Sequence, residues 1–347
     1  MADATAIAKF ADNVRAHVVH MRAVGSPLYE HMFIRMAEDR QMLEFALLEH
    51  DPIPMRLFFG AHFMLLDKPE QPVARYFRSL SEDPLPPQEA WPVFRQYCLD
   101  HAEELRGIMR TRTVQTTTVE RAACLAIALA RIAVDGEPVS VIEIGCSAGL
   151  LLLFDEYRFD YGPAGALGRA DAALTVKLPV HGTGFAAPAR LPRVARRIGM
   201  DLDPVDPADP QAHRWIHANL FPEWVEQRAR LCKALDLRAG YPLETVRGDA
   251  IALLPDLLER IRGPVCVMHS GFMNYLSDAQ RAHLDATLAA QSRARTVHKI
   301  GLDVTLPEYT AGYHRMTLRH TRYMQGAPQE TVLGNSDLLG QALNWTG

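Results

Sequence analysis

With 347 residues, the chain is long enough for one large domain or two smaller ones with a substantial core. Its 48% hydrophobic and 22% charged residues exclude a largely disordered chain, because these are the proportions of an ordinary globular protein. A net charge of −4 excludes a strong general attraction to nucleic acid or to anionic membranes, so we expect neither as a partner.

Cysteine usage and the length of apolar runs bear on the compartment. The five cysteines are odd in number and form no C-x-x-C pair, which argues against a disulfide framework. Residues 1–9 lack the basic and apolar segments of a signal peptide, and apolar runs such as 122–130 are too short to span a bilayer. We therefore expect a reduced, cytoplasmic protein.

The first part of the chain has the pattern of packed helices. Apolar residues recur at helical spacing at positions 28, 32, 36, 43 and 47, and a proline-rich loop over 81–87 precedes another helix that runs to about residue 110. A strongly apolar helix is expected over 119–133. We predict an all-helical N-terminal region over 1–134, which would cap the rest of the protein.

From residue 139 the pattern changes to alternating strands and helices, which predicts a parallel sheet with crossover helices over 135–347. We expect the tail, 313–345, to form an antiparallel hairpin around 325–328. The strands are expected at 139–144, 194–200, 244–246, 264–268 and 295–304, and the helices at 212–235, 251–261 and 277–290, with Ser277 and Gln280 forming a capping box at the start of the last.

The segment 157–192 is longer than a normal connection between the first helix and the second strand. It contains several Gly and Pro residues and a strand-like piece at 174–180. Either an inserted hairpin or lid near the site, or a surface excursion with no role, would fit this pattern.

A glycine loop follows the first strand. Gly145 and Gly149 flank Ser147, and Glu143 lies two residues before the first glycine. The dinucleotide fingerprint fails at two of its three glycine positions. The pattern acid-x-Gly-x-(Gly/Ser)-x-Gly instead resembles the first motif of class I S-adenosylmethionine (SAM) methyltransferases, with Ser147 in place of the middle glycine.

The same letters read as Gly-x-Ser-x-Gly, the nucleophile elbow of α/β-hydrolases, in which Ser147 would attack an ester. Candidate acids and bases follow in the chain at Asp201, Asp249, His269 and His298. An elbow normally follows several strands, however, whereas only helices are expected before this one. The hydrolase interpretation also leaves Glu143 and the endings of the next two strands unexplained.

Acidic residues end the second and third predicted strands. The phrase ending in Asp201 resembles the ending of strand two in class I methyltransferases, where the carboxylate accepts both ribose hydroxyls. Asp249 and Ala250 resemble the strand-three ending that meets adenine. Each acid alone would fit a helix N-cap. Their order after the glycine loop favours a cofactor site, because ligands of open α/β sheets bind at the carboxyl ends of strands.

Several phrases together resemble a bacterial family of unknown function that is grouped with methyltransferase-like folds. They are Glu-Ile-Gly-x-Ser-Ala-Gly-Leu from residue 143, Tyr-Arg-Phe-Asp-Tyr-Gly from 157, Arg-Ile-Gly-x-Asp-Leu-Asp-Pro from 197, Arg-Gly-Asp-Ala from 247, and His269-Ser270. The resemblance implies a Rossmann-like, class I methyltransferase-like sheet of seven strands in the order 3-2-1-4-5-7-6, parallel except for strand seven. The helical region would pack over the carboxyl ends of its strands.

The resemblance implies that the protein binds SAM and methylates an unidentified small molecule. Gly145, Ser147 and Gly149 would pass under the cofactor, Glu143 would orient its methionine end, Asp201 would hold the ribose, and Asp249 with Ala250 the adenine. His269, at the end of the fourth strand, is a candidate general base, although a structural histidine fits equally well. Two alternatives stay open: a fold that binds a nucleoside cofactor without methyl transfer or has lost binding, and a Ser147 hydrolase.

We expect no metal site. His213 and His217 are four residues apart on a predicted helix, but no neighbouring residue supplies the third ligand that a catalytic zinc requires.

Overall fold

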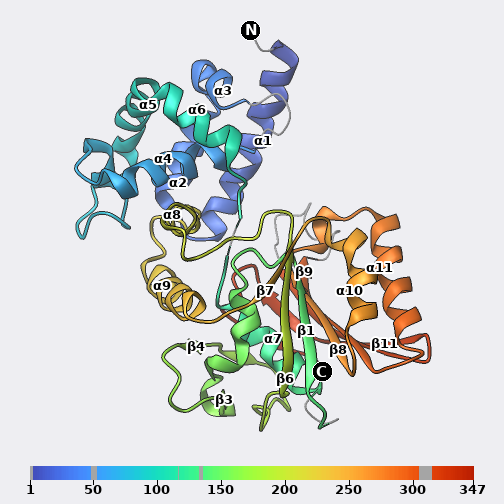
Figure 1. Ribbon diagram of the computed structural model, residues 1–347. Helices are drawn as coiled ribbons and strands as arrows, with labels where there is room; N and C mark the ends of the chain where they lie inside the picture. Colours follow the sequence, from blue (N-terminus) through green and yellow to red (C-terminus); the bar gives the residue numbers. More distant parts are fainter. Residues whose placement is uncertain (1–2, 48–52, 116, 133–135, 305–314) are drawn as a thin grey trace. The chain divides into compact units, whose positions relative to one another are not determined.

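The computed structural model describes residues 3–47, 53–115, 117–132, 136–304 and 315–347. The chain divides into two compact units, coloured along the sequence in Figure 1. The first consists of Met1–Thr116 and Asp209–Ala229, and the second of Thr117–Ala208 and Arg230–Gly347.

The described helices and strands of the first unit are all helices, as expected for the N-terminal region. Its bounds differ from the predicted 1–134, because the apolar helix expected at 119–133 belongs to the second unit and Asp209–Ala229 belongs to the first. Its helices are α1 (Ala4–Ala23), α2 (Pro27–Met36), α3 (Arg40–Ala46), α4 (Met55–Asp67), α5 (Ala90–Asp100), α6 (Ala102–Thr111) and α8 (Pro210–Ala218), with 3₁₀ turns η1 (Pro72–Tyr76) and η2 (Pro87–Glu89). Among the described residues, no helix is both long and apolar enough to cross a membrane.

Aromatic side chains form the centre of this unit. Phe58 of α4 stacks on Phe33 of α2 and on Phe94 of α5, with ring centroids 4.5 and 5.4 Å apart. Trp215 of α8 meets Phe63 of α4 edge to face at 5.7 Å. These rings bury large apolar areas, which is why α8 packs with the N-terminal helices although it lies far from them in sequence.

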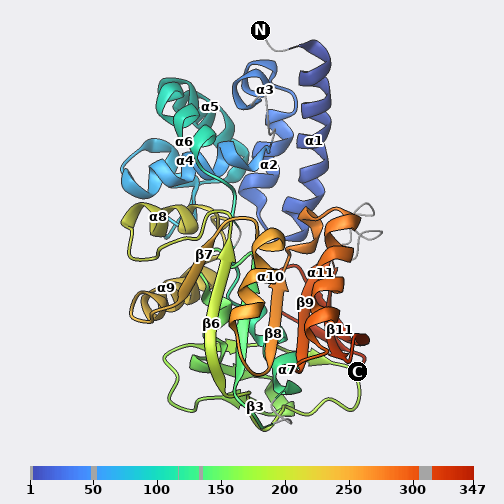
Figure 2. The same cartoon turned by 45° about the vertical axis from the view of Figure 1, so that its right-hand side comes forward.

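The second unit is built on a nine-stranded sheet in the order β5-β12-β11-β10-β9-β8-β1-β6-β7. Figure 2 labels β7, β6, β8, β9 and β11 of this sheet. Five neighbouring strands are parallel: β7 (Glu244–Arg247), β6 (Val194–Asp201), β1 (Val139–Ile144), β8 (Val265–Ser270) and β9 (Val297–Val304). The other strands are β10 (Arg315–Met324), β11 (Ala327–Asp337), β12 (Leu343–Trp345) and β5 (Val180–His181).

The five predicted parallel strands are observed near their predicted positions and in the predicted order 3-2-1-4-5. The predicted total of seven strands and the order of the last two are wrong, and strand six, β10, runs antiparallel to strand five where only strand seven was expected to be antiparallel. β10 pairs with β9 and β11 with β10, both antiparallel, so the hairpin continues the sheet in sequence order. Only residues 305–314 separate β9 from β10. That connection is shorter than the dozen or more residues of a parallel crossover, which agrees with the antiparallel pairing of β9 and β10.

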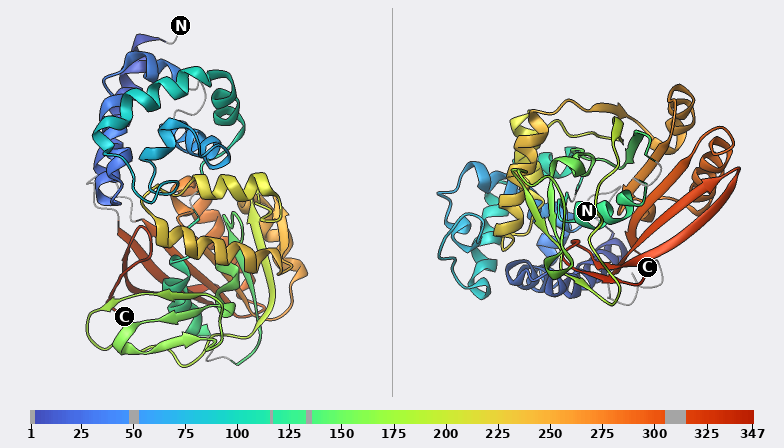
Figure 3. Two further views of the ribbon diagram at one scale, coloured as in Figure 1. Left: turned by 90° about the vertical axis from the view of Figure 1, so that its left-hand side faces the viewer. Right: turned by 90° about the horizontal axis from the view of Figure 1, so that it is seen from below.

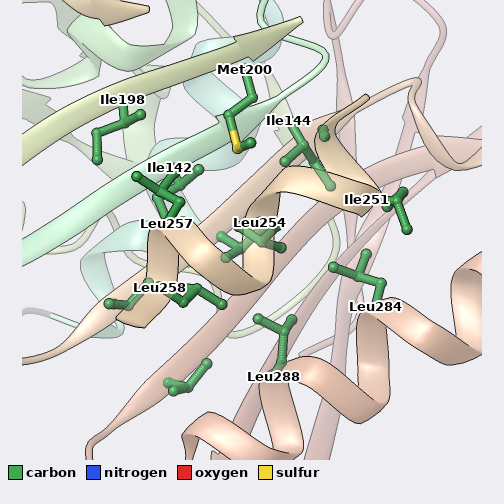
Figure 4. Close-up of a cluster of buried hydrophobic side chains, with 14 of the residues drawn as sticks. Ile142, Ile144, Ile198, Met200, Ile251, Leu254, Leu257, Leu258, Leu284 and Leu288 are labelled. Carbon is green, nitrogen blue, oxygen red and sulfur yellow. The ribbon is translucent and has the colours of Figure 1, made fainter. Parts of the chain in front are cut away.

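Two helices, α10 (Ala250–Arg260) and α11 (Asp278–Gln291), supply the apolar core on one face of the sheet. Figure 4 shows Leu254 and Leu257 of α10 among Ile142 and Ile144 of β1, all of them buried. Side chains of a strand alternate between faces, so Val141 and Glu143 face the other side. α7 (Arg121–Ala130) contacts β9 and β10.

The predicted helices differ from the observed ones in three places. The helix expected to run to about residue 110 is two helices, α5 and α6. The predicted helix 212–235 is two helices, α8 and α9 (Val225–Ala239), because Pro222 lies between them and proline removes a helical hydrogen bond. The run after the glycine loop is the 3₁₀ helix η4 (Leu150–Glu156). The helices predicted at 251–261 and 277–290 are confirmed as α10 and α11, including the capping box of Ser277 and Gln280.

The segment 157–192 forms β2 (Arg158–Asp160), β3 (Ala166–Gly168) and β4 (Thr175–Lys177), a small sheet in the order β3-β2-β4, with the 3₁₀ turn η5 (Gly162–Ala164). β4 contacts α7, and β5 joins the main sheet beside β12. Figures 2 and 3 show this segment at the end of the unit where the parallel strands begin. This placement favours a structural insertion over a lid at the carboxyl ends.

Candidate functional site

The glycine loop has a left-handed backbone at three positions. Gly145, Ser147 and Gly149 have φ angles of 75°, 49° and 71°. A Cβ atom on Gly145 would lie 2.6 Å from the ring of Phe272, so this position needs glycine for both its backbone and its surroundings. Ser147 adopts a conformation that costs energy in a residue with a side chain, and its neighbours must hold it there.

Asp201 ties the glycine loop to the end of β6. Its Oδ2 accepts a hydrogen bond from the Ser147 backbone N–H at 2.8 Å, and its Oδ1 accepts one from Asp203 N–H at 3.0 Å. The Ser147 carbonyl accepts from Val205 N–H at 3.0 Å, and Ser147 Oγ lies 3.1 Å from Thr117 Oγ1. The loop after β1 and the carboxyl end of β6 therefore form one hydrogen-bonded structure.

Glu143 lies directly below this loop on β1 and is 2% exposed. Its Oε2 atom has no hydrogen-bond partner among the described residues. Burial, followed by the negative charge of Asp201, raises the pKa of Glu143 well above its usual value. A buried carboxyl group with an unused oxygen thus adjoins a second carboxylate at the carboxyl ends of two paired strands.

Asp249 follows the next strand, β7, which pairs with β6 through Asp201 and Arg247. Asp249 Oδ1 accepts from Ile251 N–H at 2.9 Å and caps α10, while Ala250 is buried in the first turn. The structure therefore brings the glycine loop, Glu143 and Asp201 together and places Asp249 and Ala250 at the adjacent strand end.

β8 neighbours β1 on the side opposite to β6. His269 lies in β8 and is 3% exposed. Its Nδ1 atom is 2.6 Å from Oδ2 of Asp303. Both residues line a cavity of about 230 Å³ that none of the predicted cofactor-binding residues lines. The predicted site residues therefore fall into two places, the glycine loop and the His269 cavity.

Asp303, on β9, was not predicted as a site residue from the sequence. Its Oδ1 accepts hydrogen bonds from the backbone N–H groups of Phe272 at 2.9 Å and Met273 at 3.1 Å. Burial by itself would raise the pKa of Asp303, but His269 and these two N–H groups outweigh it and lower the pKa. Gly301, in the interior of the same strand, could have pointed to this place, because a glycine inside a strand indicates that another group lies close to the backbone.

The hydrolase alternative shares one feature with this geometry, the positive φ of Ser147. However, the buried pair of His269 and Asp303 lines a cavity that Ser147 does not line.

In the helical unit, the rings of His213 and His217 lie 4.7 Å apart. No group of three or more potential ligands with metal-binding geometry occurs in the described parts of the chain.

Comparison with known proteins gives one assignment. No curated protein matches the chain in sequence. A family model described as an uncharacterized protein conserved in bacteria (DUF2332) matches residues 11–345. This match spans both units and the glycine loop, and the chain accordingly belongs to the DUF2332 family.

Proposed function

We propose that the second unit binds SAM at the glycine loop and transfers its methyl group to a small-molecule acceptor. The observation that carries this proposal is the buried Glu143 carboxyl, whose Oε2 atom has no described partner and which lies beneath a loop fixed by Asp201. Unused buried polar atoms are rare in folded proteins, and a ligand is one explanation for them.

The chemistry of these groups fits the cofactor. A carboxylate offers about four lone-pair sites, and the backbone N–H groups of Ser147 and Asp203 use one on each oxygen of Asp201. The remaining sites suit the two hydroxyls of a ribose. Glu143 would hold the methionine end, and Asp249 with Ala250 the adenine, as the resemblance to class I methyltransferases implies.

SAM would supply an electrophilic methyl group, so the protein's task is to bind, orient and exclude water. Glu143 and Asp201 would bind the cofactor. His269 follows Met268, which pairs with Glu143 of β1, so an acceptor at the imidazole would lie at the strand end next to the glycine loop. Nδ1 of His269 lies 2.6 Å from Asp303, and the imidazole would accept a proton from this acceptor as it takes up the methyl group. No metal takes part in this proposal.

Calorimetric titration with SAM and S-adenosylhomocysteine tests the cofactor assignment. Two charge-assisted hydrogen bonds at roughly 1.5–3 kcal/mol each predict that Asp201→Ala weakens binding at least about 10-fold. Asp201→Asn is the matched variant, since an amide oxygen can still accept from Ser147 N–H. Asp203→Ala, at an exposed residue paired with Arg247, should have a smaller effect. Equal affinities for wild type and Asp201→Ala would contradict the ribose assignment.

The alternatives separate in the same experiments. Binding without methyl transfer to any acceptor would support the nucleoside-binding alternative. The positive φ of Ser147 favours the hydrolase as the second candidate. Stoichiometric labelling of Ser147 by a fluorophosphonate would establish that class, whereas Ser147→Gly should keep cofactor binding if the loop is a cradle.

A further inference from the structure

The His269 cavity has features that the cofactor site does not use. It lies within the second unit beside β8, β9, β10, α11 and the 3₁₀ turn η6 (Met273–Tyr275). Its volume is about 230 Å³. Sites for drug-sized ligands are larger, with volumes of about 300–1,000 Å³. The part of a ligand that lies inside this cavity would be about the size of a single substituted ring.

Three residues form a row across the sheet in this cavity. His269 pairs with Gly301, and Gly301 pairs with Arg319. His269 and Arg319 are two strand spacings apart, about 10 Å between backbones. Gly301 contributes no side chain between them, and a Cβ there would lie 2.4 Å from Cε1 and 3.0 Å from Nε2 of His269. The glycine therefore leaves room for the imidazole and for the space next to it.

The contacts of Asp303 show which nitrogen of His269 lies against a carboxylate. Its pKa is lowered, so the group is a carboxylate and can only accept. Oδ1 takes two backbone N–H groups, and Oδ2 faces Nδ1 of His269 at 2.6 Å. Nδ1 is therefore the nitrogen that faces a carboxylate, and a ring that carries its hydrogen there has a lone pair on Nε2. Both ring nitrogens are buried, and neither makes an aligned hydrogen bond with a described residue.

Arg319 is the least committed of the cations that line the cavity. Arg281 donates to the Met273 carbonyl and to Asp278, and Lys299 pairs with Asp285. The one ion pair described for Arg319 is a long contact of 3.5 Å between Nε and Glu330 Oε1. Its terminal nitrogens can therefore form the two parallel hydrogen bonds with which arginine binds a carboxylate.

We propose that this cavity binds a small hydroxylated carboxylate, such as a hydroxybenzoate, with its carboxylate on Arg319 and its hydroxyl donating to Nε2 of His269. The inference names the acceptor class and in that respect rests on the proposed function. Binding itself requires only the row of His269, Gly301 and Arg319.

The first test uses wild-type protein and calorimetry without SAM. 4-Hydroxybenzoate is the probe, benzoate lacks its hydroxyl, and methyl 4-hydroxybenzoate lacks its charge. We expect 4-hydroxybenzoate to bind about 10-fold more tightly than either relative, because each lacks one of the two polar contacts. No binding of 4-hydroxybenzoate, or equal affinity for all three compounds, would overturn the proposal.

Variants assign the contacts. Arg319→Gln should weaken 4-hydroxybenzoate and benzoate about equally, and His269→Gln should remove the preference for the hydroxyl. Arg262→Gln, at an exposed position before β8, is the charge-matched control. Unchanged affinity in Arg319→Gln would overturn the carboxylate assignment. If either variant fails to fold, long-range ¹H–¹⁵N spectra of wild-type protein decide: a hydrogen on Nδ1 supports the site, and a hydrogen on Nε2 contradicts it.

The SAM titration keeps the two proposals distinguishable. Arg319→Gln should leave SAM affinity unchanged, because Arg319 does not contact the glycine loop in the proposal. Hydroxybenzoate binding without SAM binding would refute the proposed function and leave the cavity assignment standing. SAM binding without hydroxybenzoate binding would refute the cavity assignment alone.

Discussion

At the scale of single residues, Glu143 is held in a state that costs stability. Burial raises its pKa in the folded protein above that of the unfolded chain. Its contribution to stability is therefore fully present below the unfolded pKa, about 4.3, and is lost as the pH rises toward the folded pKa. We expect Glu143→Gln to raise the melting temperature at pH 7 and to change it little at pH 4.

Glu137→Gln is the control for this measurement, since Glu137 is exposed shortly before β1. It should not reproduce the pH-dependent gain. If Glu143 also holds a ligand, the stabilised Glu143→Gln variant should bind SAM more weakly, because stability is often sacrificed at functional sites. A melting temperature that falls at pH 7 would show that a partner compensates the buried carboxyl.

Gly301 allows a second residue-scale prediction. Gly301→Ala places a methyl group 2.4 Å from His269 Cε1, so the imidazole must move. Such overpacking costs roughly 1–3 kcal/mol in the free energy of unfolding. Gly107→Ala, in α6, meets nothing within 4 Å and should instead stabilise by roughly 0.5–1 kcal/mol. Chemical denaturation of both variants checks the contrast, and a neutral Gly301→Ala would show that the ring has room to move.

Residues that belong to a local sequence motif were easier to predict than residues that are brought together only by the pairing of strands. The sequence indicated Ser147 between its glycines and Asp201 at a strand end, and the structure joins them by a hydrogen bond. Asp303 and Arg319 have no local motif. Their proximity to His269 depends on the pairing of β9 with β8 and β10, which the sequence does not specify directly.

At the scale of elements, Asp249 has a structural role that can be separated from cofactor binding. It caps α10, so Asp249→Ala should cost about 1 kcal/mol in the free energy of unfolding, and Asp249→Asn, which can also cap, should cost little. If Asp249 also meets adenine, both variants should weaken SAM binding, because an amide presents only one oxygen. Normal SAM affinity in the Asn variant would leave Asp249 with the cap alone.

Elements were predicted well where their residues are distinctive. The β-branched run 139–144 is the observed β1, and the Ser277–Gln280 capping box marks the start of α11. The helix over 212–235 was predicted as continuous, but Pro222 divides it into α8 and α9. The short β5 and β12 have two and three residues, too few for a period-2 pattern, and this is why a nine-stranded sheet looked like seven strands.

At the scale of the whole molecule, the helical unit takes its residues from two distant segments. The segment Asp209–Ala229 follows β6 in the chain but packs with the N-terminal helices. His62 of α4 shows the connection, since its Nδ1 lies 3.1 Å from the Ala218 carbonyl and its Nε2 lies 2.8 Å from Ser79 Oγ. Local periodicity gives a helix at this segment but not its partners.

Both units contain buried histidines that should make the protein sensitive to acid. Burial lowers the pKa of His62 well below its usual value, and burial followed by the Arg228 charge lowers that of His217 to about 3. In the second unit, burial and the adjacent His298 lower the pKa of His320 to about 3. Each ring is neutral when folded and takes up a proton on unfolding below pH 6.5.

The resulting stability is present above pH 6.5 and is lost as the pH falls, toward 3 for His217 and His320, by up to roughly 1.4 kcal/mol per pH unit for each histidine. We expect the melting temperature to fall steadily between pH 6.5 and 4, and His320→Gln to make this fall shallower by removing one of the three protons. His181→Gln, at an exposed position in β5, is the control and should leave the slope unchanged. A slope that His320→Gln leaves as steep as in wild type would mean that His320 is already protonated in the folded protein.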